Sequence, residues 1–183
     1  MFKTYDRYFN HTKSYLWGCN FSHSLFFKGG KGGEQITNNM GNRAVITLKP
    51  HESKSYDNQI GIYVHWNGGR DSIEAFLTYC KLHGFRSPSS DSYGFARLTQ
   101  VIANFFGGGL SIGVDICKHL DCDNYDNGVY LIKDWEIAGR DHFRGQEQKE
   151  YSLVDMLIDI DKCQPTEMQL GEGKIKELLA KSD

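Results

Sequence analysis

Apolar and polar residues alternate along residues 59–66, and the pattern then changes to a helical period. The side chains expected on the buried face of this strand are Ile60, Ile62 and Val64. After two glycines, apolar residues recur with the spacing of one helix face, at Ile73, Phe76, Leu77 and Cys80. We therefore predict a strand over 59–66 and a helix over 72–83, which Gly84 ends.

The same two patterns predict the other elements of the chain. Alternation predicts strands over 42–49, 110–116, 129–132 and 134–138. Helical spacing predicts a helix over 93–106, another that begins after Ser152, and a short one near the C-terminus. We expect the strands at 42–49 and 59–66 to pair in antiparallel fashion. Together these elements predict a single α+β domain, with an antiparallel sheet of about four to five strands and about two to three helices packed on it.

Residues 1–39 differ in character from the rest of the chain. They are rich in aromatic residues without a sustained period, and they end in the glycine-rich linker 28–33. Because aromatic side chains supply large contact areas, the candidate binding residues of this extension are Tyr5, Tyr8, Tyr15 and Trp17. In the alternatives, the aromatics pack back onto the domain, or Met40 is the ancestral start of the chain. The core domain is expected over 40–165, followed by a tail at 166–183 with a short helix.

Polar residues gather where the 59–66 strand gives way to the helix. Asn67, Gly68 and Gly69 predict a tight turn, because glycines tolerate positive φ and allow a close approach of the backbone. Asp71 is expected to cap the helix and Glu74 to complete a capping box. The candidate catalytic residues are His65, Asp71 and Glu74, and the candidate binding residues are Asn67, Gly68, Gly69 and Arg70. In the alternative, Asp71 and Glu74 only cap the helix, and Arg70 is solvated.

A second polar feature follows one side of the predicted 93–106 helix. It consists of Arg97, Gln100 and Asn104. Such a row is usually a solvent-exposed face, but a row that lines a cleft with the glycine turn would bind a nucleotide or phosphate. We therefore count these three as candidate binding residues.

Residues 117–128 contain two metal-site patterns and one turn pattern. Cys117, His119 and Cys122 are possible zinc ligands, but a convincing fourth ligand is missing. Asp121, Asp123 and Asp126 resemble an acidic calcium loop without the EF-hand order or its terminal glutamate. Asn127 and Gly128 form a preferred hairpin turn, so we interpret this stretch as a hairpin and predict neither a metal site nor a cofactor. The charged segment 140–150 is expected to be exposed.

Composition narrows the class of protein. With 183 residues and a formal net charge of −2, the chain fits one domain, and its bulk charge does not imply a broad surface for a nucleic-acid backbone. No apolar run approaches the roughly 20 residues needed to cross a bilayer. The N-terminus lacks the order of a signal peptide, and an odd number of cysteines without framework spacing fits reduced thiols. We expect a cytoplasmic protein.

Four segments together resemble a group of small proteins carried by bacteriophages and other mobile elements. The segments are 40–47 (MGNRAVIT), 64–72 (VHWNGGRDS), 100–108 (QVIANFFGG) and 123–128 (DNYDNG). The resemblance covers about residues 40–163, and with its N-terminal extension the chain is similar to inhibitors of type II CRISPR effector nucleases, the type II-A anti-CRISPR proteins. This resemblance implies a protein in the bacterial host that binds the nuclease or its guide RNA complex, including action through loss or shortening of the guide RNA. It assigns no catalytic residue.

The residues themselves leave two functions open. In the first, the aromatic extension anchors an inhibitor whose acidic residues at 121–126 compete for a basic nucleic-acid channel. In the second, an RNA- or nucleotide-processing enzyme uses the glycine turn: His65 is the acid or base, Arg70 and Arg97 hold phosphate, and Asp71 or Glu74 orients the histidine.

Overall fold

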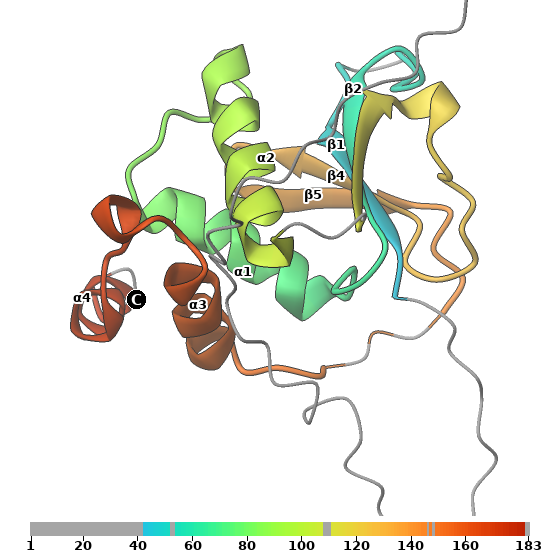
Figure 1. Ribbon diagram of the computed structural model, residues 1–183. Helices are drawn as coiled ribbons and strands as arrows, with labels where there is room; N and C mark the ends of the chain where they lie inside the picture. Colours follow the sequence, from blue (N-terminus) through green and yellow to red (C-terminus); the bar gives the residue numbers. More distant parts are fainter. Residues whose placement is uncertain (1–41, 52–53, 108–110, 146, 148, 182–183) are drawn as a thin grey trace, which may run out of the picture. The chain divides into compact units, whose positions relative to one another are not determined.

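Five strands form a mixed sheet in the order β3-β2-β1-β4-β5. The strands are β1 (Ala44–Leu48), β2 (Ile60–Val64), β3 (Ile112–Ile116), β4 (Val129–Lys133) and β5 (Glu136–Asp141). They belong to a computed structural model that describes residues 42–51, 54–107, 111–145, 147 and 149–181 (Figure 1). The N-terminal extension lies outside the described residues, together with its candidate residues Tyr5, Tyr8, Tyr15 and Trp17.

The central strand, β1, pairs in opposite senses on its two edges. It runs antiparallel to β2, with Ala44 opposite Val64, and parallel to β4, with Val45 opposite Val129. The β2–β3 and β4–β5 pairs are antiparallel. The α+β prediction is therefore confirmed, but the sheet is mixed rather than antiparallel. The reason is that the long connection from β1 through β2, two helices and β3 brings β4 in along the same direction as β1.

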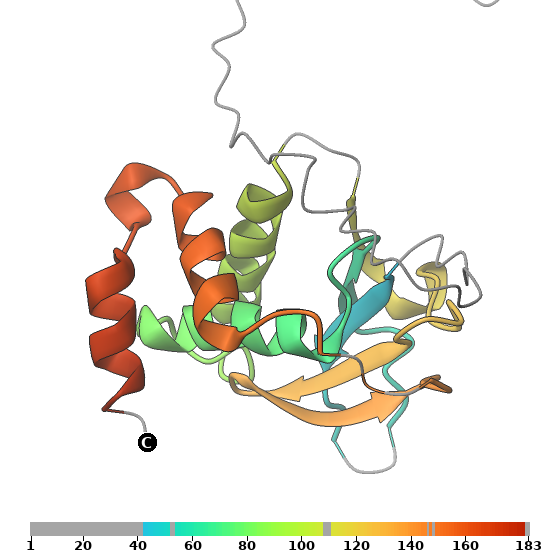
Figure 2. The same cartoon turned by 90° about the horizontal axis from the view of Figure 1, so that it is seen from below.

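Among the described residues, four α-helices lie on one side of the sheet (Figures 1 and 2). They are α1 (Arg70–Leu82), α2 (Ser92–Phe106), α3 (Leu153–Lys162) and α4 (Glu172–Leu179). Gly84 ends α1 as predicted and has a φ of 68°, and Gly107 follows the end of α2 with a φ of 64°. The short helix predicted in the tail is α4, and it buries Ile175 in the same core. In the described part of the chain, no helix is long and apolar enough to cross a membrane.

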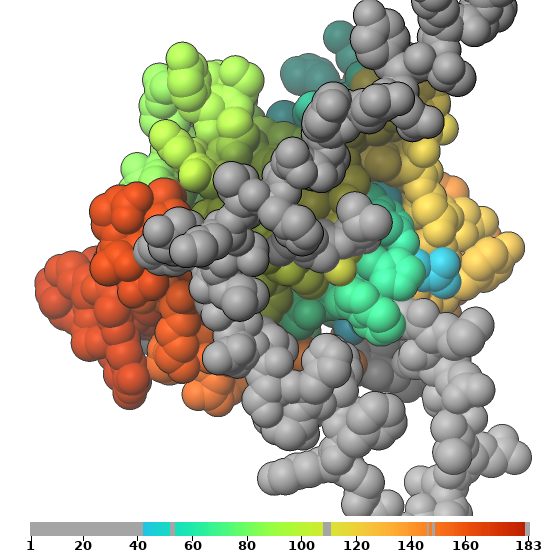
Figure 3. All heavy atoms as spheres, viewed as in Figure 1, coloured from blue at the N-terminus to red at the C-terminus, as the bar shows by residue number. Residues whose placement is uncertain are grey.

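The main core lies between the sheet and the helices. The predicted stripe of α1 is fully part of it, with Ile73, Phe76, Leu77 and Cys80 all buried. They pack with buried residues of the sheet such as Ile62. The opposite face of the sheet carries a smaller buried cluster of Val45, Cys117 and Val129, against which residues of the 117–122 segment pack. Figure 3 shows residues 111–128 (gold) on the right of the visible face, opposite α3 and α4 (orange and red).

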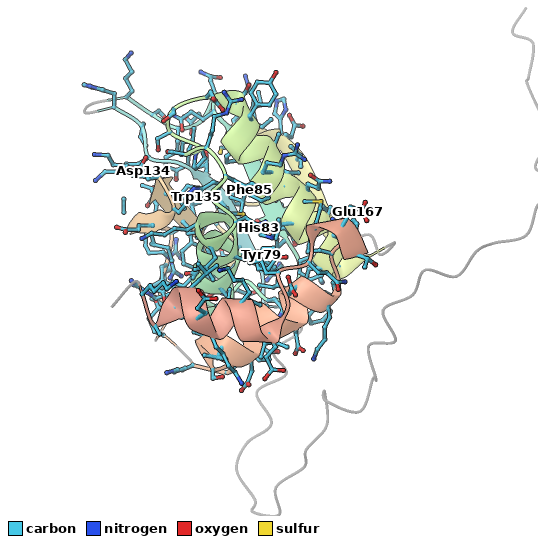
Figure 4. All side chains as sticks on the ribbon, turned by 90° about the vertical axis from the view of Figure 1, so that its left-hand side faces the viewer. Tyr79, His83, Phe85, Asp134, Trp135 and Glu167 are labelled. Atoms are coloured by element: carbon cyan, nitrogen blue, oxygen red, sulfur yellow. The ribbon has the colours of Figure 1, made fainter. Side chains whose placement is uncertain are left out.

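The tight hairpin of this sheet lies between β4 and β5, and the residues around Asn127 do not form one. The hairpin predicted at Asn127–Gly128 is wrong, because the preceding residues form a 3-10 helix at Cys117–His119 and a loop, while β3 pairs with β2. The turn between β4 and β5 carries Asp134 and Trp135, and the indole Nε1 of Trp135 donates a hydrogen bond of 3.2 Å to the carbonyl of Phe85 (Figure 4). This contact fastens the hairpin to the end of α1.

Candidate functional site

Three of the four segments that carry the sequence resemblance meet at one end of the sheet. Because β1 is antiparallel to β2 and parallel to β4, the start of β1, the end of β2 and the start of β4 lie together. We call this region the motif end; it consists of Asn42–Arg43, His65–Arg70 and Asn124–Gly128. The carboxyl end of β5 also reaches it, since Arg140 pairs with Tyr130 of β4.

The glycine turn packs tightly against the start of β1. The backbone N–H of Gly68 donates a hydrogen bond of 2.7 Å to the carbonyl of Asn42, and the Gly68 carbonyl accepts one of 3.0 Å from the Tyr130 hydroxyl. A side chain at position 68 would place its Cβ 2.5 Å from the Asn42 oxygen, so only glycine fits. The predicted close approach is confirmed. The positive φ, however, belongs to Asn67 at 53°, because Asn also tolerates the left-handed region.

The start of α1 differs from the predicted capping box. Gly69 is the N-cap residue, with extended backbone and no side-chain cap, and Asp71 lies within the first turn. One oxygen of Asp71 accepts from the N–H of Ser72 at 2.8 Å. The other accepts from the N–H groups of Glu150 and Tyr151 at 2.7 and 2.8 Å. Glu74 pairs with Arg70 at 2.7 Å. The capping-box prediction is therefore wrong, because Asp71 ties a distant loop to α1 instead.

His65 lies at the motif end with a different partner from the one expected. Its Nδ1 is 3.1 Å from the Tyr63 hydroxyl, and its ring meets the ring of Trp66 edge to face at 4.9 Å. Burial raises the pKa of Tyr63, and the nearby Arg43 opposes that rise. Among the described residues, Asp71 and Glu74 accept hydrogen bonds from other partners: Asp71 from the N–H groups of Ser72, Glu150 and Tyr151, and Glu74 from Arg70. The structure thus brings His65 together with Tyr63 rather than with the two carboxylates.

The loop before β4 is folded around one buried asparagine. The Oδ1 of Asn124 accepts hydrogen bonds from the N–H groups of Asp126 and Gly128 at 3.1 and 3.0 Å, and its Nδ2 donates to the Asp121 carbonyl at 3.0 Å. Between Asn124 and Asp126, Tyr125 has a φ of 60° and is 77 % exposed. A bulky residue rarely adopts this conformation, which costs on the order of 1–2 kcal/mol.

The acidic residues of this loop face arginines. Asp126 pairs with the Nε of Arg43 at 2.7 Å, and Asp121 lies 3.5 Å from the same guanidinium. Asp123 pairs with Arg144 at 3.1 Å. Their negative charge is therefore largely neutralised within the molecule, which does not favour their predicted role as a nucleic-acid mimic.

The residues of the two metal-site patterns have other partners. The thiol of Cys122 donates to the carbonyl of Cys117 at 3.3 Å, while His119 lies 3.4 Å from Asp115. Burial raises the pKa of the Cys122 thiol to about 11, which disfavours the thiolate that zinc requires. Over the described ranges, no group of three His, Cys, Asp or Glu residues is placed to hold a metal ion.

Arg140 is a central residue of the motif end that the sequence analysis missed. Its guanidinium carbon lies 3.7 Å from the ring centre of Tyr130 and 4.0 Å from that of Phe143. Its Nη2 donates to the carbonyl of Asn127 at 2.6 Å, and its Nη1 pairs with Glu147 at 2.7 Å. Only 12 % of the side chain is exposed, and burial lowers the arginine's pKa. The expectation that this residue is exposed is wrong, because its aromatic partner comes from the neighbouring strand.

Within the described ranges, the polar row of α2 contacts the segment after α3 and not the glycine turn. Arg97 donates to Gln100 at 2.6 Å, and Asn104 donates to the side chain of Gln164 at 2.9 Å. Gln164 is buried and donates to the carbonyl of Val101 at 3.2 Å. In the part of the chain that the structure describes, this row joins α2 to the segment after α3, and no hydrogen bond links it to the glycine turn.

A further polar group lies at the end of α1, away from the motif end. Tyr79 donates a hydrogen bond of 2.7 Å to the buried carboxylate of Asp161, and the ring of His83 stacks on Phe85 at 4.8 Å. Figure 4 shows Tyr79, His83 and Phe85 following one another along this end of the helix. Asp161 also accepts from the N–H groups of Leu170 and Gly171 at 2.8 and 2.9 Å, so the group fastens the C-terminal segment to the core.

Comparisons of the chain with protein-family models, with curated proteins and with solved structures gave no match.

Proposed function

We propose that this protein is an inhibitor of a type II CRISPR effector nuclease, acting in the cytoplasm of a bacterial host by binding the enzyme or its guide RNA complex. The observation that carries this proposal is Tyr125, a largely exposed aromatic residue held in a costly backbone conformation at the motif end. Strain of this kind persists only where the surroundings enforce it, and it concentrates at functional positions. The motif resemblance supplies the class of partner.

The contacts around Tyr125 support a binding role. Asn124 fixes the backbone before Tyr125 through the Asp121 carbonyl and after it through the N–H groups of Asp126 and Gly128, and the guanidinium carbon of Arg144 lies 5.5 Å from the Tyr125 ring centre. Tyrosine and arginine are the residues that most often dominate protein interfaces, and a side chain already held in place loses little entropy on binding. Tyr125 is therefore the proposed anchor on the domain, and the aromatic extension 1–39 the proposed second anchor.

A cleavage assay with the nuclease and its guide RNA tests the proposal. Tyr125→Ala should weaken inhibition at least about tenfold, as expected for loss of an interface anchor. Tyr93→Ala is the matched control, because Tyr93 is 64 % exposed and also lies under an arginine, Arg86 at 4.5 Å, but on α2. Equal inhibition by wild type and both variants would contradict the proposal.

A second candidate function is RNA or nucleotide processing, and the contact between His65 and Tyr63 favours it. A histidine hydrogen-bonded to a phenol supplies an acid–base pair at the motif end. Guide RNA incubated with the protein, with and without the nuclease, should then shorten to discrete products, and His65→Ala should slow this by about 10²- to 10⁴-fold. Unchanged RNA in both incubations eliminates the enzymatic function.

A further inference from the structure

Two arginines from different elements converge on one carboxylate oxygen beside the start of α1. The Nη1 of Arg140, at the end of β5, lies 2.7 Å from the Oε1 of Glu147. The Nη1 of Arg70, the first residue of α1, lies 4.0 Å from the same oxygen. Glu147 therefore makes one good ion pair and one distant one, and a single oxygen leaves most of the donors of the two guanidinium groups unused.

Arg140 is held rigidly in this arrangement. Its guanidinium packs on the rings of Tyr130 and Phe143, and the carbonyl of Asn127 accepts from its Nη2. The Nε of Arg140 is buried and has no hydrogen-bond partner among the described residues. A fixed, planar guanidinium with unmet donors is pre-organised for an oxyanion, since it loses little freedom when the ligand binds.

Glu147 can move into solvent, because its side chain is 39 % exposed. Arg140, with only 12 % of its side chain exposed, would then be a largely buried charge without its partner, which favours another anion at the same place. The other carboxylates facing the pair are already engaged: Glu74 with the Nε of Arg70, and Asp71 with the N–H groups of Ser72, Glu150 and Tyr151. Removal of Glu147 would therefore leave two arginines facing an open position.

We infer that Arg70 and Arg140 form a binding site for a phosphate group of RNA, and that Glu147 occupies this site in the free protein. Two guanidinium groups that approach one point from different directions suit a tetrahedral phosphate better than a planar carboxylate, which one arginine can hold by itself. The assignment to RNA rests on the proposed function; the oxyanion site itself rests only on the geometry of the pair.

Inorganic phosphate titrated into the full chain tests the site directly. The ¹⁵N-resolved Nε–H signal of Arg140 should shift along a saturable curve, and Glu147→Gln should tighten binding about fivefold by removing the competing carboxylate. Glu172→Gln is the matched control, since Glu172 pairs with Lys176 at 2.6 Å on α4 and its change alters the net charge equally. A shift that does not saturate, or equal tightening by the two variants, overturns the site.

A second experiment distinguishes RNA from free phosphate as the ligand of this site. Glu147→Gln should also tighten the binding of a single-stranded RNA oligonucleotide, followed by fluorescence anisotropy, by a similar factor that falls as salt rises. Tighter phosphate binding with unchanged RNA binding overturns the assignment to RNA. Saturable binding of phosphate and RNA by a chain that leaves the CRISPR nuclease fully active supports this site while overturning the proposed inhibition.

Discussion

Asn124 is the residue whose replacement tests the construction of the motif end most directly. It is almost completely buried, and its side chain makes four hydrogen bonds of 3.0–3.4 Å with backbone groups of its own loop. Asn124→Ala removes all four and leaves the buried N–H of Gly128 without its acceptor. Since each of the shorter bonds contributes about 1 kcal/mol and the longest one less, we expect the free energy of unfolding to fall by about 3 kcal/mol.

Urea denaturation of the full chain, followed by circular dichroism, measures this loss. Asn58→Ala serves as the control, because Asn58 is an exposed asparagine in another loop, and its replacement should change the free energy of unfolding by less than about 0.5 kcal/mol. Asn124→Ala should also weaken nuclease inhibition under conditions where it is fully folded, because the loop that carries Tyr125 loses the bonds that fix its backbone. A loss of stability no larger than that of the control would refute the role assigned to Asn124.

Three further experiments test the protein's stability and its proposed function. Tyr125→Gly should raise the free energy of unfolding by about 1 kcal/mol, because glycine adopts a positive φ without strain. The same replacement should weaken inhibition. A lower free energy of unfolding in the urea denaturation assay would refute the argument that Tyr125 is strained. Burial lowers the pKa of His83 below its ordinary 6.5, so the unfolded chain binds more protons just below that pH and stability should fall as pH drops through this window. Thermal unfolding at about pH 7.5 and about pH 5 should show this loss in the wild type and a smaller one in His83→Gln, and equal losses would contradict it. Deletion of residues 1–39 should leave the far-ultraviolet circular dichroism of the domain intact and abolish inhibition, so full inhibition by the shortened chain would argue against an anchor there.

The sequence predicts best what depends on neighbouring residues. The spacing of Ile73, Phe76, Leu77 and Cys80 is set by one helix turn after another, and all four are buried as expected. The alternation of β2 and the glycine stops of α1 and α2 are local in the same sense. Each of these features follows from backbone geometry within a few residues, which explains why periodicity alone identifies it.

Sequence periodicity did not predict the features that depend on residues far away in the chain. Arg140 is largely buried because the sheet register places it opposite Tyr130, and nothing in the charged stretch around it indicates that pairing. Asp71 has the sequence context of a helix cap, yet the loop at Glu150 takes one of its oxygens. The parallel pairing of β1 with β4 likewise depends on the path of the whole intervening chain. The glycine turn therefore lies where the sequence predicts it, between β2 and α1, while the residues that contact it come from segments far away in the sequence.

The position of β1 also affects how the chain folds during synthesis. Val45 emerges from the ribosome early, but its parallel partner Val129 is made only after β2, α1, α2 and β3. Until then, the edge of β1 that will pair with β4 has no neighbour. Such an unpaired edge can associate with other chains. We expect nascent chains that stop short of Lys133 to be strongly dependent on chaperones, and release from that dependence to coincide with the arrival of β4.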